Sequence, residues 1–295
     1  MPELPEVETT IKDLKRKILN RQIKDVWFDA PLLIKKPKPQ EFVSKIKGLK
    51  IKGIRRRGKN ILLDLTGEKT LLIHQKLTGH LLYGKWEVQK IGKGKFIVKP
   101  LIKGPLEEEV NNYIHLIFYL DNGWQLALSD LRKFAKVVFG RKEVIENLEE
   151  LKKLGPEPLA PDFTFENYKE IIKKQSRKIK QVLMDQEIIS GIGNIYSDEI
   201  LWEAKVHPFK PAKKLKEEEL RAIYQAMKKI LKEAIEKRGT STSDFRDPSG
   251  EKGFYTEIRR VYQREGEKCS RCKNLIKRVK IGGRSAHFCP YCQRL

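Results

Sequence analysis

The four cysteines of this chain restrict its fold more than any other feature, because all of them lie between residues 269 and 292. Cys269 and Cys272 form one Cys-x2-Cys pair, sixteen residues follow, and Cys289 and Cys292 form a second pair. This spacing is typical of a tetrahedral zinc site with four thiolate ligands. Because four protein ligands leave no position for water, we expect one structural Zn²⁺, with His287 not needed as a ligand.

The sequence around these cysteines is basic. Residues 255–295 contain eleven Lys or Arg residues against three acids. Gly282 and Gly283 suit the tip of a β-hairpin, where glycine accepts a positive φ. We therefore expect a basic zinc ribbon, a module that by itself indicates only nucleic-acid or protein binding.

The composition narrows the class of partner. The chain has 295 residues, with 62 Lys or Arg against 39 Asp or Glu and a formal net charge of +23. Such a charge points to a polyanion, and a nucleic acid is favoured over a membrane because no long apolar segment or signal peptide is evident. We expect a reducing compartment, since no cysteine is left for disulfides. We further expect a cytoplasmic monomer that is associated with the nucleoid through DNA binding.

The first segment predicts a helix. Its apolar residues recur at spacings of three and four, which places them on one face: Leu4, Val7, Ile11, Leu14 and Ile18. Pro5 is tolerated only in a first turn, so the helix begins at or just before it.

The segment from Arg21 to Phe139 is strand-like. Asp121-Asn122-Gly123 lies between two strands and predicts a hairpin with a two-residue turn. Many short strands separated by turns predict a two-sheet sandwich or flattened barrel, with the first helix packed against it. The expected strands are Gln22–Phe28, Asn60–Leu65, Thr70–His74, Tyr113–Leu120 and Trp124–Ser129.

The second half is mainly helical. A helix is expected at Lys142–Lys153, and Gly155 and Pro156 break it at a domain linker. The further expected helices are Phe165–Gln175, Lys180–Met184, Ile195–Glu203 and Glu217–Lys237. We expect an α+β chain with the helix and sandwich at 1–150, a helical domain at 151–238, a Gly- and Ser-rich loop at 239–254 and the zinc ribbon at 255–295.

The first eight residues carry a candidate nucleophile. Met1 precedes the small residue Pro2, so we expect its removal, which leaves a free proline amine. An α-amino group titrates near ~8, and the helix dipole disfavours its protonation further. Attack by a secondary amine on a sugar C1′ yields an iminium, which is an electron sink, and Glu3 is near enough to act as an acid. The alternative is an ordinary helix start, in which Glu3 and Glu6 only complement the dipole.

These eight residues resemble, nearly letter for letter, the N-terminus of bacterial formamidopyrimidine-DNA glycosylase. The related endonuclease VIII family shares Pro2 and Glu3 but typically has Gly where this chain has Leu4. The resemblance extends along the chain and implies a catalytic role for Lys59 and a phosphate contact for His74. It further implies that Leu77, which stands where Met is usual, fills the space left by a flipped base.

Later motifs resemble the same family. The resemblance implies that Arg132 pairs with the orphaned cytosine and that Phe134 wedges beside it, although Ala135 stands where Gly is common. It implies that the helical domain at 151–238 is a helix–two-turn–helix DNA-binding domain in which Asn194, after the turn Gly191-Ile192-Gly193, contacts phosphate. It implies further phosphate contacts for Tyr262 and Arg284. It also implies that the loop at 239–254 folds over an extruded lesion, with Thr240 and Ser241 as plausible reading residues.

The implied function is base-excision repair of duplex DNA. The resemblance predicts removal of 8-oxoguanine and ring-opened purines through a Schiff base on Pro2, followed by β,δ-elimination. Two alternatives remain open: an endonuclease VIII-like glycosylase for oxidised pyrimidines, and a non-catalytic zinc-ribbon protein that binds nucleic acid.

Overall fold

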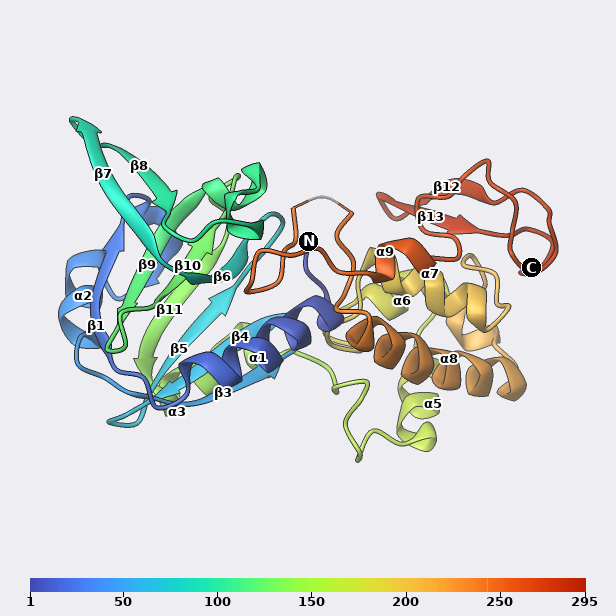
Figure 1. Cartoon of the computed structure of the whole chain (residues 1–295). Helices are drawn as coiled ribbons and strands as arrows, with labels where there is room; N and C mark the ends of the chain where they lie inside the picture. The colour runs from blue at the N-terminus through green and yellow to red at the C-terminus, as the bar shows by residue number, and fades with distance from the viewer. Residues whose placement is uncertain (243) are drawn as a thin grey trace. The chain divides into compact units, whose positions relative to one another are not determined.

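The computed structural model describes residues 1–242 and 244–295, and the chain divides into two compact units (Figure 1). One unit comprises Met1–Lys152 and Lys237–Thr256, and the other comprises Lys153–Glu236 and Glu257–Leu295. The first contains the sheets built from β1–β11 and the helices α1–α4, whereas the second contains α5–α8 and the zinc ribbon with β12 and β13. The predicted α+β class is therefore confirmed. Within the described ranges, no helix is long and apolar enough to span a membrane.

Two sheets form the first unit. The four-stranded sheet has the order β1-β9-β10-β6 and is antiparallel throughout. The five-stranded sheet has the order β2-β11-β5-β4-β3, in which only β2 and β11 are parallel. The strands of the first sheet are β1 (Ile23–Phe28), β6 (His80–Gly84), β9 (Ile114–Leu120) and β10 (Gln125–Ser129). Those of the second are β2 (Ile34–Lys36), β3 (Ile51–Arg57), β4 (Asn60–Leu65), β5 (Lys69–His74) and β11 (Lys136–Arg141).

The core lies between these sheets, because alternate residues of each strand point inward. Ile61 and Leu63 of β4 and Leu116 and Phe118 of β9 share one apolar cluster with α1 (Leu4–Ile18) and α2 (Pro39–Ile46). The predicted stripe of α1 is buried along its whole length. The sandwich with a packed leading helix is thus confirmed.

A third sheet covers the outer face of the four-stranded sheet. It is the hairpin of β7 (Trp86–Gly92) and β8 (Lys95–Pro100), which the strand pattern did not predict. Trp86 of β7 packs with Ile117 of β9 and Ala127 of β10 in a second apolar cluster. Because this cluster buries the outward residues of β9 and β10, these strands are apolar on both faces.

The β9–β10 connection differs from its prediction. Leu120 donates its N–H to the carbonyl of Trp124 at 2.9 Å, so three residues form the loop rather than two. Gly123 has a φ of +76°, whereas Asn122 stays outside the left-handed region and its side chain accepts the N–H of Trp124 at 3.2 Å. The Asn-Gly pair therefore predicted the hairpin correctly but its turn length wrongly, since Asn122 bonds locally instead of adopting positive φ.

The predicted helices are present, with one exception. The expected helix at 142–153 is two short ones, α3 (Lys142–Glu146) and α4 (Glu149–Lys152), because Asn147 bonds its side chain back to the carbonyl of Glu143 and ends the first. In the second unit, helix α7 packs against both α6 and α8. The remaining helices are α5 (Phe165–Lys173), α6 (Ile179–Met184), α7 (Asn194–Glu203), α8 (Glu217–Glu236) and α9 (Tyr255–Ile258).

The Gly- and Ser-rich loop returns to the first unit. Its ends are paired through backbone hydrogen bonds. The N–H of Phe254 donates to the carbonyl of Lys237 at 2.8 Å, and the N–H of Tyr255 donates to the carbonyl of Gly239 at 3.0 Å. Its later part is hydrogen-bonded to the sandwich, because the backbone N–H of Tyr83 donates to the carbonyl of Pro248 at 2.7 Å. Ser243, within this loop, lies outside the described residues.

Phe42 of α2 provides a test of the sandwich core. Its ring is fully buried and stands edge-on to Phe118 of one sheet and Phe139 of the other. We expect Phe42→Ala to lower the free energy of unfolding by about 3–5 kcal/mol, measured by denaturant titration. Val144→Ala, at a half-exposed position, is the control and should stay within about 0.5 kcal/mol of wild type.

Candidate functional site

The start of α1 is joined to the Gly-rich loop through one buried carboxylate. Glu6 is 1% exposed; its Oε2 accepts the N–H of Glu3 at 2.7 Å and its Oε1 accepts the N–H of Thr240 at 2.7 Å. Gly239 has a φ of +78°, and a Cβ there would lie 2.8 Å from Glu6 Oε1. A glycine is therefore required where the loop passes the helix start.

The three candidate catalytic residues lie at one end of the sandwich. Pro2 and Glu3 precede α1 and are buried, while Met1 is 45% exposed. Lys59 is buried in the turn between β3 and β4. An ion pair of 2.9 Å between Arg56 Nε of β3 and Glu8 Oε2 of α1 holds this turn near the first turns of the helix.

A second buried carboxylate joins the two loops that carry the candidate wedge residues. Asp130 is fully buried; it accepts the hydroxyl of Thr78 and the N–H of Ala135, the latter at 2.7 Å. Thr78 follows Leu77, and its hydroxyl also accepts the N–H of Arg132 at 3.2 Å. The loops at 74–79 and 130–135 are thus one bonded unit that carries Leu77, Arg132 and Phe134.

Arg132 and Phe134 are exposed and adjacent. The Arg132 guanidinium lies 4.6 Å from the centre of the Phe134 ring, which is 50% exposed. Lys133 between them has a φ of +55°, so the segment is a turn rather than an extended strand. An exposed cation stacked on an exposed aromatic ring contributes nothing to the core. The pair is placed to make stacking contacts with another molecule, such as the bases of a nucleic acid.

His74 is neutral. Burial and the charges of Lys76 and Lys59 lower its pKa from 6.5 to about 3. Its Nδ1 accepts the N–H of Lys76 at 3.0 Å, so its proton lies on Nε2. His74 pairs with Asn60, the neighbour of Lys59, in the β4–β5 register. His74 and Lys59 are therefore side by side, one a neutral donor and one a cation.

The second unit brings together the other three candidates around α7. Asn194 is the first residue of α7, and its Nδ2 lies 3.5 Å from Ser285 Oγ of β13 (Arg284–Phe288). Its buried Oδ1 has no partner among the described residues. Arg284 is exposed beside the tip of the hairpin formed with β12 (Lys277–Ile281), where Gly282 and Gly283 both have positive φ as expected.

Two consecutive buried acids of α7 hold the ribbon in place. Asp198 accepts the N–H and the Nδ1 of His287 at 2.9 and 3.0 Å, and the ammonium of Lys180 at 2.5 Å. Glu199 accepts the backbone N–H groups of residues 260, 261 and 262, each within 2.9 Å. Burial raises the pKa of Glu199, and these three N–H bonds oppose that shift. The helix that carries Asn194 therefore positions both Tyr262 and the Arg284 strand.

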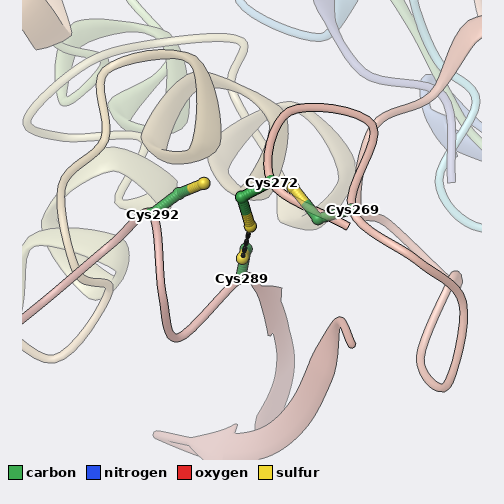
Figure 2. Close-up of side chains that lie close together, drawn as sticks. All are labelled: Cys269, Cys272, Cys289 and Cys292. Carbon is green, nitrogen blue, oxygen red and sulfur yellow. Dashed lines mark hydrogen bonds between the residues drawn. The ribbon is translucent and has the colours of Figure 1, made fainter. Parts of the chain in front are cut away.

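The four cysteines converge as the sequence predicts (Figure 2). All four sulfur atoms lie within 4.8 Å of one another, and Cys272 and Cys289 are 3.4 Å apart. A tetrahedral zinc site requires sulfur separations of about 3.8 Å, so the donor set fits one Zn²⁺ with four thiolate ligands. Trp202 Nε1 donates to the Cys269 sulfur at 3.4 Å, a contact that stabilises a thiolate.

Four acids of this arrangement were missed by reasoning from the sequence: Glu6 as a link to the loop, Asp130, Asp198 and Glu199. Each of these side chains is at most 1% exposed and is bonded to residues distant in the sequence. Glu6 and Asp130 stood within recognised motifs, but neither was assigned a link to a distant loop. For Asp198 and Glu199 no local signal exists, because an acid on a helix is usually solvated.

Comparisons with known proteins match the whole chain. Residues 1–137 match the formamidopyrimidine-DNA glycosylase N-terminal domain, 154–246 its H2TH domain, and 266–295 a zinc finger found in FPG and IleRS. The chain belongs to the formamidopyrimidine-DNA glycosylase family. Glycosylases of that name from Pelotomaculum thermopropionicum and Carboxydothermus hydrogenoformans are 37% and 38% identical over 295 and 294 residues, with full coverage of both chains.

Solved structures agree with this family assignment. The wild-type Lactococcus lactis Fpg bound to DNA containing N7-benzyl-Fapy-dG has a TM-score of 0.85 and 31% identity, with 100% of both chains covered. A complex of the same protein with abasic-site DNA has a TM-score of 0.86 and 31% identity, with 99% of this chain and 100% of that chain covered. The resemblance of the first eight residues is thus confirmed at the level of the family.

The cysteine site provides one test. We expect about one zinc per chain, and Cys269→Ser should lose most of it and weaken duplex binding about tenfold, since the ribbon no longer holds Arg284. Metal content is measured by a chelator assay and binding by anisotropy. Ser270→Ala, on the neighbouring exposed residue, should keep both properties. Full binding by a metal-free variant would contradict a bracing role.

His74 provides a second test. In the unfolded chain it takes up a proton near pH 6.5, whereas in the folded chain it does so only near 3. Folded stability due to a neutral His74 is therefore present above pH 6.5 and lost as the pH falls toward 3. Between pH 6 and 5 we expect the free energy of unfolding of wild type to fall faster than that of His74→Gln, by about 1 kcal/mol per pH unit. Identical slopes would show that His74 is already charged in the folded protein.

Proposed function

We propose that this protein removes oxidised purines, 8-oxoguanine and formamidopyrimidines, from duplex DNA and then cleaves the resulting abasic site. The observation that carries the proposal is the match to the family, which covers the whole chain and includes its N-terminal, H2TH and zinc-finger domains. The DNA complexes of the Lactococcus lactis protein support Fapy-dG and abasic sites as ligands. We propose that it acts as a monomer on nucleoid DNA in the cytoplasm.

Binding depends on cations and neutral donors that contact the phosphate backbone. Lys59, His74, Asn194, Tyr262 and Arg284 contact phosphates, and the duplex bends as the damaged nucleotide turns out. Leu77 and Phe134 enter the vacated space, while Arg132 donates to the base edge of the orphaned cytosine. The bond network of Asp130 supports this step, because it joins the two loops that carry these side chains.

The chemical step uses the start of the chain. Once Met1 is removed, the Pro2 amine attacks C1′ of the deoxyribose, and Glu3 protonates the sugar ring oxygen. The glycosidic bond breaks, and the base leaves with its electrons and takes up the proton that the Pro2 nitrogen loses. The C1′–O4′ bond then opens onto the ring oxygen that Glu3 protonates, so the sugar remains attached as a ring-opened iminium. The iminium acidifies the C2′ hydrogen, so β-elimination and then δ-elimination expel the two phosphates. The short bond between Glu6 and the N–H of Glu3 supports a rigid position for these residues.

The covalent intermediate is directly testable. Borohydride should reduce the iminium and trap a protein–DNA adduct, and Pro2→Gly or an N-terminal extension should lower the excision rate by at least about 100-fold. The adduct is measured on a denaturing gel. Both variants should still bind a duplex with an abasic-site analogue, which controls for folding. An unchanged rate after blocking of the N-terminus would exclude the terminal amine as the nucleophile.

The lesion comparison separates the proposal from its nearest rival. An endonuclease VIII-like enzyme would use the same amine on oxidised pyrimidines; Leu4 and the Arg132–Phe134 pair favour the purine-specific enzyme. We expect excision of 8-oxoguanine opposite cytosine to be at least about tenfold faster than excision of thymine glycol, measured under single-turnover conditions. The reverse order would favour the rival, and absence of any adduct would favour a non-catalytic ribbon protein.

A further inference from the structure

The hairpin of β7 and β8 has a free edge. β8 pairs only with β7, and no other strand among the described residues bonds to it (Figure 1). The hairpin is rigidly seated, because Trp86, Val88 and Val98 pack on the outer face of the four-stranded sheet and Phe96 stands edge-on to Trp27 at 5.5 Å. A fixed strand with unpaired N–H and C=O groups is a template for another strand.

A groove follows this edge. It encloses about 600 Å³ and is lined on one side by five consecutive residues of β8, from Phe96 to Pro100. Because neighbouring residues of a strand point to opposite faces, a groove lined by five in a row lies along the edge and not over one face. The opposite wall is formed by residues 112–115 and by Asp29.

The wall of the groove contains a buried ring nitrogen without a partner. His115 Nδ1 donates to Asp29 Oδ1 at 2.7 Å, because a carboxylate only accepts. His115 is 8% exposed, and its Nε2 is buried with no hydrogen bond among the described residues. An extended peptide backbone has both N–H and C=O groups, so an occupant of this kind would supply the missing partner.

The charges around the edge select the kind of peptide. Lys90, Lys93, Lys95 and Lys99 are exposed and have no ion-pair partner among the described residues. Ile97, which lines the groove, is 38% exposed. Lysines without an ion-pair partner, beside a groove whose β8 wall includes Phe96, Ile97 and Val98, match a strand whose side chains are acidic on one face and apolar on the other.

DNA fits this surface less well. A duplex has no strand of amides to pair with β8, whereas an extended peptide has one. We propose that the edge of β8 binds an extended acidic peptide of another protein by strand addition, with its apolar side chains in the groove. This site is independent of the proposed DNA chemistry.

The test uses the full-length protein and a fluorescein-labelled synthetic peptide of alternating glutamate and isoleucine, measured by anisotropy. We expect micromolar binding, which Ile97→Asp and the double variant Lys95→Glu, Lys99→Glu each weaken at least about tenfold. Lys52→Glu, an exposed lysine of β3, is the matched control and should bind like wild type. All four positions are exposed, so the variants should fold, which circular dichroism checks.

Two further probes separate strand addition from simple charge attraction. The same peptide with N-methylated backbone amides should lose binding at least about tenfold, because it cannot donate to β8. An oligoglutamate of equal charge should bind at least about tenfold more weakly than the alternating peptide. Equal binding of all three peptides, or no binding of any, would overturn the proposal. The proposal would also be overturned if the wild-type protein bound no peptide and the double variant Lys95→Glu, Lys99→Glu bound duplex DNA more weakly. The hairpin would then be a DNA contact.

Discussion

A buried carboxylate must be satisfied by hydrogen bonds, and the internal structure of each of the two units depends on this constraint. Asp130 accepts from two loops of the sandwich, and Glu6 accepts from the helix start and the Gly-rich loop. In the second unit Asp198 and Glu199 do the same for the zinc ribbon. Removal of such an acid would leave several buried N–H groups unpaired, so each loop is held to one geometry.

These acids explain how the residues proposed to contact DNA can be exposed and still be held in one geometry. Leu77, Arg132 and Phe134 lie on turns, which by themselves would be mobile. Their turns share bonds to Asp130 and Thr78, so the side chains keep their mutual positions while remaining open to solvent. The same arrangement is found for Asn194, Tyr262 and Arg284. They are exposed or half-buried, whereas Asp198 and Glu199, which hold the surrounding segments, are buried. A preorganised surface loses less entropy when it orders around a bent duplex.

The β7–β8 hairpin differs from these loops because one of its edges is uncovered. It closes the apolar outer face of the four-stranded sheet, yet it leaves its own β8 edge uncovered. Its lysines form no ion pair among the described residues, although Glu87 of β7 lies opposite Lys99, whereas many lysines elsewhere are paired, such as Lys136 with Glu150 and Lys210 with Glu219. The hairpin therefore combines a structural role on one face with an unused edge, which is the basis for its proposed peptide site.

The sequence by itself determined the elements that depend on local periodicity or fixed spacing. The stripe of α1, the five expected strands, the four main helices and the Cys-x2-Cys pairs all follow from the distance between residue types along the chain, and the structure confirms them within a few residues. Only the tertiary structure decided the three-residue β9–β10 loop, the break between α3 and α4, and the β7–β8 hairpin. It alone revealed the bonds of Glu6, Asp130, Asp198 and Glu199, because their partners lie far away in sequence and a buried acid has the same letter as a solvated one.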